Sequence, residues 1–185
     1  IIVNEMQSKA DFHLDIHGGD LNEALTPHLY YAGKAELKII NKIKEVAAVL
    51  DVKYMVKSNS TTGVHSYGSI SGTPSMILER GGMGLCLTED VKAYKKDLYS
   101  VLNKMEILVT EETIKEEIPI DITEANYLEA LNEGCWTSFV EAGELISKGQ
   151  VLGEVTDFFG NLVDRYYAEF NGVVMYHTVA LAVAK

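Results

Sequence analysis

His13, His17 and Glu79 are the residues of this chain whose types and positions could do hydrolytic chemistry. His13 and His17 lie four residues apart in the stretch FHLDIHGGD, the spacing at which two imidazoles on one helix can bind zinc. The stretch instead alternates apolar and polar residues and ends in a glycine pair, which predicts a strand. Four residues of strand span about 13 Å, and an ion with ligand bonds of ~2 Å cannot reach both histidines. At most one of them binds a metal, and His17, at the end of the strand, is the better placed.

Glu79 ends a second apolar run, SMILE, directly before a glycine-rich turn. A carboxylate that leaves an apolar strand tends to keep its proton more readily than one in water. Such a group suits a general base that acts on a water molecule held by a metal ion. The competing interpretation is a salt bridge with Arg80, which is weakened because neighbouring strand residues point to opposite faces. Glu79 is therefore the candidate catalytic residue.

Asp15, His65 and Tyr67 are further candidates, as support for a ligand or as contacts to a substrate. Asp15 shares the strand face of His17, where it could orient a ligating imidazole; a solvated strand residue is the alternative interpretation. His65 and Tyr67 lie in 58–74, a segment of mostly Ser, Thr and Gly that predicts a long exposed loop. Long loops are often functional, so both side chains either contact a substrate or pack against their own loop.

The elements predicted around these residues alternate between strands and helices. Strands are predicted at 12–17, 52–57 and 75–79, an amphipathic helix within 33–51, and a second helix with Thr88 as its N-cap. This alternation indicates an α/β layer with a mostly parallel sheet. Sites in such sheets form at the carboxyl ends of the strands, and His17 and Glu79 both stand at such ends.

The hydrophobic pattern of the sequence changes after 117–124, where Pro119 and acidic residues suggest a linker. Beyond it, short apolar runs alternate with glycines, which predicts a small all-β module. The predicted fold class is thus α/β with flanking helices, followed by an all-β domain. We expect the catalytic domain at 1–118 and the β domain at 119–185.

Composition and charge exclude several classes of partner. The 185 residues carry a net charge of −11 without a Lys/Arg cluster, which disfavours nucleic acid and anionic membranes. The longest apolar runs fall far short of the roughly 20 residues needed to cross a bilayer. The two cysteines, Cys86 and Cys135, favour a reducing cytoplasm. Neither has a clear basic partner, so a cysteine hydrolase is not favoured.

Three stretches, in this order, resemble the succinylglutamate desuccinylase/aspartoacylase family, which has a zinc-carboxypeptidase-like fold. FHLDIHGGD is similar to the strand that bears the third zinc ligand, and PSMILERGG to the strand of the catalytic glutamate. ISKGQVLGEVTDFFGNLVDRYYAEFNGVV resembles the family's C-terminal β domain, a barrel-like sandwich. The resemblance covers nearly the whole chain and implies zinc as cofactor, with His17 as a ligand and Glu79 as the catalytic residue.

The family's other two zinc ligands, a His and a Glu in an H-x-x-E pattern, lie upstream, and no such pattern precedes His17. The asparagine-arginine substrate motif of the family is missing as well. We therefore expect either a C-terminal piece of a longer enzyme or a chain whose N-terminal part is not included. Catalytic zinc needs about three protein ligands, so the chain as given is not expected to catalyse without the missing part.

The function implied by the resemblance is zinc-dependent hydrolysis of amide bonds in N-acyl amino acids or similar small carboxylates. One alternative is a zinc carboxypeptidase that acts on peptides. The other is a metal-free, degenerate homologue that serves as a binding module. The expected partner is a small molecule in the cytoplasm, and the sequence leaves a homo-oligomer open.

Overall fold

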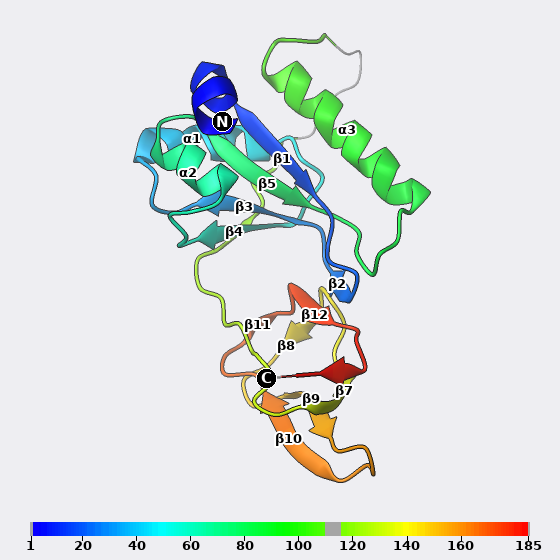
Figure 1. The fold of residues 1–185 in the computed structure, drawn as a ribbon. Coiled ribbons are helices and arrows are strands. Elements are labelled where there is room, and N and C mark those ends of the chain that lie inside the picture. The colour runs from blue at the N-terminus through cyan, green and yellow to red at the C-terminus, as the bar shows by residue number, and fades with distance from the viewer. Residues whose placement is uncertain (1, 110–115, 185) are drawn as a thin grey trace. The chain divides into compact units, whose positions relative to one another are not determined.

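The computed structural model describes residues 2–109 and 116–184 (Figure 1). The chain forms two compact units that are interleaved in the sequence. The first unit comprises Ile1–His17, Pro27–Arg80 and Leu87–Ala125, and the second comprises Gly18–Thr26, Gly81–Cys86 and Asn126–Lys185. The division at 118/119 drawn from the sequence differs from this one in two respects. It takes no account of the two early segments of the second unit, and it separates residues 119–125 from the first.

The first unit is built on a mostly parallel sheet, as the sequence predicts; the sheet has five strands, and those at His28–Ala32 and Ile120–Ile122 were not predicted. In spatial order its strands are β1 (His13–His17), β5 (Ser75–Glu79), β3 (His28–Ala32), β4 (Tyr54–Ser58) and β6 (Ile120–Ile122). The pairs β1–β5, β3–β4 and β4–β6 are parallel, whereas β3 and β5 run antiparallel. Strand β6 lies beyond the sequence-based boundary, yet it pairs with β4 and belongs to this sheet.

One face of this sheet carries the hydrophobic core. Leu29 on β3, Met55 on β4, and Met76 and Leu78 on β5 are fully buried. They pack against α1 (Leu37–Ala47) and α3 (Thr88–Lys104), which contribute the buried residues Ile39, Ile43, Val46, Ala47 and Val101. Both helices were predicted, but Leu87 rather than Thr88 occupies the N-cap position of α3, and no side chain caps it.

The opposite face is covered by polar elements: the helix α2 (Val64–Ile70) packs against β5, β3 and β1. The N-terminal turns η1 (Ile2–Met6) and η2 (Gln7–Lys9) adjoin it. Gln7 is 2% exposed, and its side-chain amide donates to His13 Nδ1 and to the Val64 carbonyl, each at 3.0 Å. His13, Asp15 and His17 point to this polar face, because alternate residues of a strand share a face.

Helix α2 contradicts the prediction of a long loop over 58–74. Its composition of Ser and Gly is poor for an isolated helix, but these small residues let the helix lie close to β5. Ser69 Oγ donates to the Ser75 carbonyl at 3.0 Å and accepts from the Ser75 N–H at 3.1 Å. Tertiary contacts therefore stabilise a helix that local propensity disfavours.

The second unit consists of short antiparallel strands, which confirms the predicted all-β module. Its largest sheet has the order β10-β9-β7-β13. Two further pairs are β11–β8 and β12–β2. The bounds of these strands are β2 (Glu23–Leu25), β7 (Gly134–Ser138), β8 (Leu145–Ile146), β9 (Val151–Thr156), β10 (Leu162–Tyr167), β11 (Gly172–Val173), β12 (Tyr176–Thr178) and β13 (Ala182–Val183).

Among the described residues, none of the helices is both long enough and apolar enough to cross a membrane.

Candidate active site at the ends of strands β1 and β5

His17 and Glu79 are neighbours at the carboxyl ends of two adjacent parallel strands. They are directly paired in the register of β1 and β5, so their side chains lie on the same face. His17 Nδ1 lies 3.7 Å from Glu79 Oε1. The His17 side chain is 46% exposed and the Glu79 side chain 14%. The structure thus brings the two main candidates from the sequence together at one edge of the sheet.

Asp15 lies on the other side of the His17 ring. Its Oδ2 atom is 3.2 Å from His17 Nε2, within the reach of a long hydrogen bond. The imidazole therefore has one carboxylate near each nitrogen, and the contact to Asp15 is the shorter one. Asp15 and Glu79 thus flank the imidazole, with Nε2 on the Asp15 side and Nδ1 on the Glu79 side.

His65 lies on α2, not in a loop, and it is almost fully buried, with 8% exposure. Burial lowers the pKa of His65 to about 4; the nearby Asp15 opposes this shift, while His17 and His13 add to it. His65 Nε2 lies 3.0 Å from Ser66 Oγ, a geometry that could activate a serine nucleophile. Ser66 is fully buried, however, so a substrate cannot reach this hydroxyl.

Tyr67 also lies on α2 and is 51% exposed. Its hydroxyl and ring form no hydrogen bond or ring contact with any residue that the structure describes. Its role as a substrate contact stays a prediction, as does that of His65.

His28 is a residue that sequence reasoning missed. It begins β3 and pairs with Glu79 across the antiparallel β3–β5 register, so His17, Glu79 and His28 form a row across three strands. His28 is 1% exposed, and its ring packs edge-on against Tyr30 with centroids 4.9 Å apart. The sequence carries no signal for this row, because only the sheet order places β3 beside β5.

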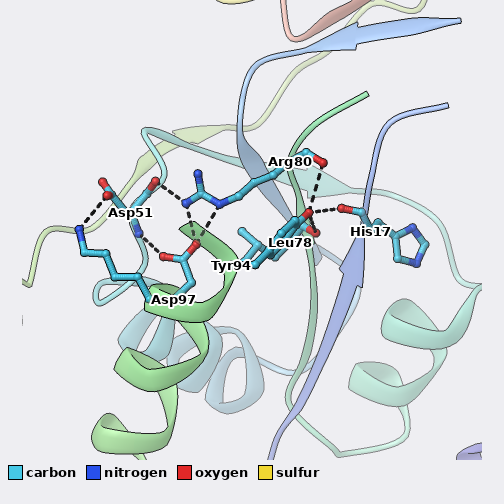
Figure 2. A network of polar contacts seen from close by, with 7 residues as sticks. His17, Asp51, Leu78, Arg80, Tyr94 and Asp97 are labelled. Carbon is cyan, nitrogen blue, oxygen red and sulfur yellow. Dashed lines mark hydrogen bonds and ion pairs between the residues drawn. The ribbon is translucent and has the colours of Figure 1, made fainter. Parts of the chain in front are cut away.

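Arg80 points away from this row, into the opposite side of the sheet (Figure 2). Its guanidinium donates to Asp97 Oδ2, at 2.9 Å from Nε and 2.6 Å from Nη2, and to the Asp51 carbonyl at 2.7 Å. Arg80 is 7% exposed and Asp97 1%. The salt bridge between Arg80 and Glu79 considered from the sequence does not form, and Arg80 is too buried to bind a substrate.

The fit of a zinc ion can be judged from the donor groups near His17. The residues within 2–109 and 116–184 contain no group of three or more His, Cys, Asp or Glu side chains that could hold a metal ion. A catalytic zinc site needs about three protein ligands and one open position. These residues alone therefore do not fit a zinc site, although His17 offers one nitrogen for it.

Comparison with protein-family models and with curated proteins gives no match. Solved structures do match. The product-bound ectoine utilization protein EutE (DoeB) from Ruegeria pomeroyi has a TM-score of 0.86 at 17% identity, covering 99% of this chain and 58% of that one. A succinylglutamate desuccinylase from a Silicibacter species has a TM-score of 0.85 at 19% identity, covering 99% of this chain and 57% of that one. A succinylglutamate desuccinylase/aspartoacylase from Rhodobacter sphaeroides has a TM-score of 0.83 at 18% identity, covering 100% of this chain and 58% of that one.

These similarities show the fold. Nearly the whole of the chain superimposes on the structures, which confirms the fold expected from the resemblance, while the chain spans less than two thirds of the length of each.

Proposed function

We propose that this chain is part of a hydrolase that cleaves the amide bond of N-acyl amino acids or similar small carboxylates, with Glu79 as the general base. The observation that carries the proposal is the pairing of His17 and Glu79 at the ends of adjacent parallel strands, with Nδ1 and Oε1 3.7 Å apart. The fold, which the chain shares with succinylglutamate desuccinylase/aspartoacylase structures, supports it.

Glu79 has the environment that a general base needs. Its carboxylate is mostly shielded by the sheet but is 14% exposed, so a water molecule can reach it. In the proposed reaction Glu79 takes a proton from the attacking water and gives it to the leaving amine. Acid–base catalysis by one positioned group is typically worth about 10²- to 10⁴-fold in rate.

His17 is the zinc ligand in this proposal, and Asp15 orients it. The contact of 3.2 Å between Asp15 Oδ2 and His17 Nε2 fixes the ring and makes Nδ1 the nitrogen that is available, a common arrangement for ligating histidines. Zinc, when bound, polarises a carbonyl and acidifies a water molecule. Since the described residues do not fit a complete site, the proposal takes the remaining ligands from outside them.

The substrate in this proposal is a small molecule in the cytoplasm. The net charge of −11 disfavours nucleic acid, and two cysteines favour a reducing compartment. The relatives in fold include a succinylglutamate desuccinylase and an ectoine utilization protein with its product bound. N-Succinylglutamate is therefore the first substrate to test.

Replacement of Glu79 tests the proposal. In the full-length protein, Glu79→Gln should lower the kcat of amide hydrolysis about 10²- to 10⁴-fold, because the amide cannot accept the proton. The unfolding transition and the zinc content should stay unchanged. Glu89→Gln, at an exposed position of α3, is the matched control. Unchanged hydrolysis by Glu79→Gln would refute the proposed function, and release of a terminal amino acid from peptides instead of an acyl acid would favour a carboxypeptidase.

A metal-free binding module is the second candidate, and one observation favours it: the absence of a three-ligand group among the described residues. Zinc content separates the two functions. If the full-length protein purified from zinc-supplemented cells contains no stoichiometric zinc and hydrolyses no N-acyl amino acid, the binding module is the better assignment.

A further inference from the structure

Tyr94, on helix α3, reaches the carboxyl ends of both strands that carry the candidate site. Its hydroxyl contacts the His17 carbonyl and lies 3.3 Å from the Leu78 carbonyl and 3.4 Å from the Arg80 carbonyl (Figure 2). One hydroxyl proton is donated to one carbonyl at a time, and His17 is the nearest acceptor. Helix α3 therefore contacts the backbone of the very residue whose imidazole faces Glu79.

The His17 carbonyl accepts a second hydrogen bond, from the backbone N–H of Arg80 at 3.3 Å. This bond lies beyond the last paired residues of the ladder, His17 and Glu79. His17 and Arg80 are also two of the three residues at which the chain leaves the first unit. Strand ends open more readily than strand centres. The two hydrogen bonds to the His17 carbonyl therefore hold the ends of β1 and β5 together beyond the last residue pair of the ladder.

The ring of Tyr94 lies beside the buried ion pair of Arg80 and Asp97. Asp97 lies one turn further along α3 and accepts from the guanidinium at 2.6 and 2.9 Å, and its other oxygen accepts from the Asp51 N–H at 2.8 Å. The Arg80 guanidinium also lies 5.9 Å from the centre of the Tyr94 ring.

We propose that Tyr94 is a positioning residue for the candidate site: its hydroxyl, which contacts the carbonyls at the ends of β1 and β5, sets the separation between the His17 imidazole and the Glu79 carboxylate. Tyr94 acts through backbone carbonyls and does not touch a substrate. The consequence for catalysis rests on the proposed function. Misplacement of a reacting group by about 1 Å can cost about 10²-fold in rate, so one hydrogen bond at a strand end has a measurable effect.

Tyr94→Phe in the full-length protein removes the hydroxyl and keeps the ring. We expect the kcat for N-succinylglutamate to fall about 10- to 100-fold, with KM changed less than about 2-fold. The ¹³C NMR chemical shift of the His17 carbonyl should change, because it loses a hydrogen bond. Tyr99→Phe is the matched control: Tyr99 lies on the same helix and is 55% exposed, so neither kcat nor the carbonyl shift should change.

The two measurements separate this inference from the proposed function. If Glu79→Gln leaves hydrolysis unchanged, the proposed function fails, but the His17 carbonyl shift still decides whether Tyr94 holds the strand end. If Glu79→Gln is inactive while Tyr94→Phe keeps full kcat, or if the carbonyl shift does not move, the inference is overturned. Should Tyr94→Phe not fold, 3-fluorotyrosine in place of Tyr94 makes the hydroxyl a stronger donor at nearly the same volume. The carbonyl shift must then move in the direction of a stronger bond, and an unchanged shift overturns the inference.

Discussion

His65 is a buried residue with a titratable side chain. It is 8% exposed on α2, and its only hydrogen-bond partner among the described residues is Ser66, at Nε2. Burial disfavours the protonated imidazole. A buried neutral histidine of this kind links the stability of the fold to pH.

This linkage predicts a loss of stability in mild acid. The pKa of His65 is lowered to about 4 from an ordinary 6.5, so between these values the unfolded chain takes up a proton that the folded chain refuses. The stabilisation is fully present above about pH 6.5 and is lost as the pH falls towards 4. Between pH 7 and pH 4.5 the wild type should lose about 2–3 kcal/mol more free energy of unfolding than His65→Gln. Urea unfolding at both pH values measures this difference, and equal losses in the two proteins would contradict it.

The candidate site could be predicted from the sequence only where a local pattern marks a strand end. The alternation before Gly18 and the apolar run before Glu79 locate two strand ends, and parallel strands bring such ends together. His28 and Tyr94 could not be found in this way. The first depends on β5 lying beside β3, and the second on α3 crossing the ends of β1 and β5; both are tertiary facts.

At the scale of elements, α2 shows how tightly the polar face of the sheet is packed. Gly68 lies in this helix, and a Cβ atom at that position would stand 2.5 Å from Gln7 Nε2 and 2.8 Å from Ser75 Oγ. The Gln7 amide is held by its bonds to His13 and to Val64, so it cannot move aside without losing them. The glycine thus allows α2 to contact β5 and the N-terminal turns.

Helix propensity and packing make opposite predictions for Gly68→Ala. Propensity alone would stabilise the protein by about 1 kcal/mol, whereas overpacking of a close contact costs about 1–3 kcal/mol. We expect packing to dominate, so that the free energy of unfolding falls by about 1–2 kcal/mol in chemical denaturation. Tyr67→Ala, at an exposed position of the same helix, should change it by less than about 0.5 kcal/mol. A more stable Gly68→Ala variant would contradict this expectation.

The strands β1, β4 and β5 and the two long helices of the first unit could be predicted, because the sequence shows their hydrophobic periodicity, whereas β3 and β6 were not predicted. Helix α2 could not, since Ser, Thr and Gly dominate 58–74 and carry no helical period. Its hydrogen bonds connect it to Gln7, which is distant in the sequence, and to Ser75, which follows the helix. Information of this kind lies in the fold and not in the local composition.

On the scale of the whole chain, the interleaving of the two units makes the second one dependent on residues far apart in sequence. Strand β2, at Glu23–Leu25, pairs with β12, at Tyr176–Thr178. Two backbone bonds extend this pair, from the Thr26 N–H to the Met175 carbonyl and from the Val179 N–H to the Asn22 carbonyl. No single cut in the sequence separates the units, which is why a boundary drawn from composition differs from the structural one.

Removal of the chain from Tyr176 onward should therefore unpair β2. We expect the amides of residues 23–25 to lose hydrogen-exchange protection by at least about 10-fold, since their ladder partners are gone. The amides of β3 and β4, in the sheet of the first unit, should keep theirs. Hydrogen exchange followed by NMR or mass spectrometry checks both segments, and undiminished protection at 23–25 would show that β2 does not need β12.

The pairing of β2 with β12 also has a consequence for folding during synthesis of the protein. On the ribosome, Glu23–Leu25 is synthesised well before Tyr176–Thr178. The early segment must wait, unpaired, while the residues between the two strands are synthesised, because its partner does not yet exist. Long-range pairing of this kind slows folding and exposes unpaired strands to aggregation. The nascent chain is thus most vulnerable in the interval between the synthesis of β2 and that of β12, and it is there that a chaperone would be of most use.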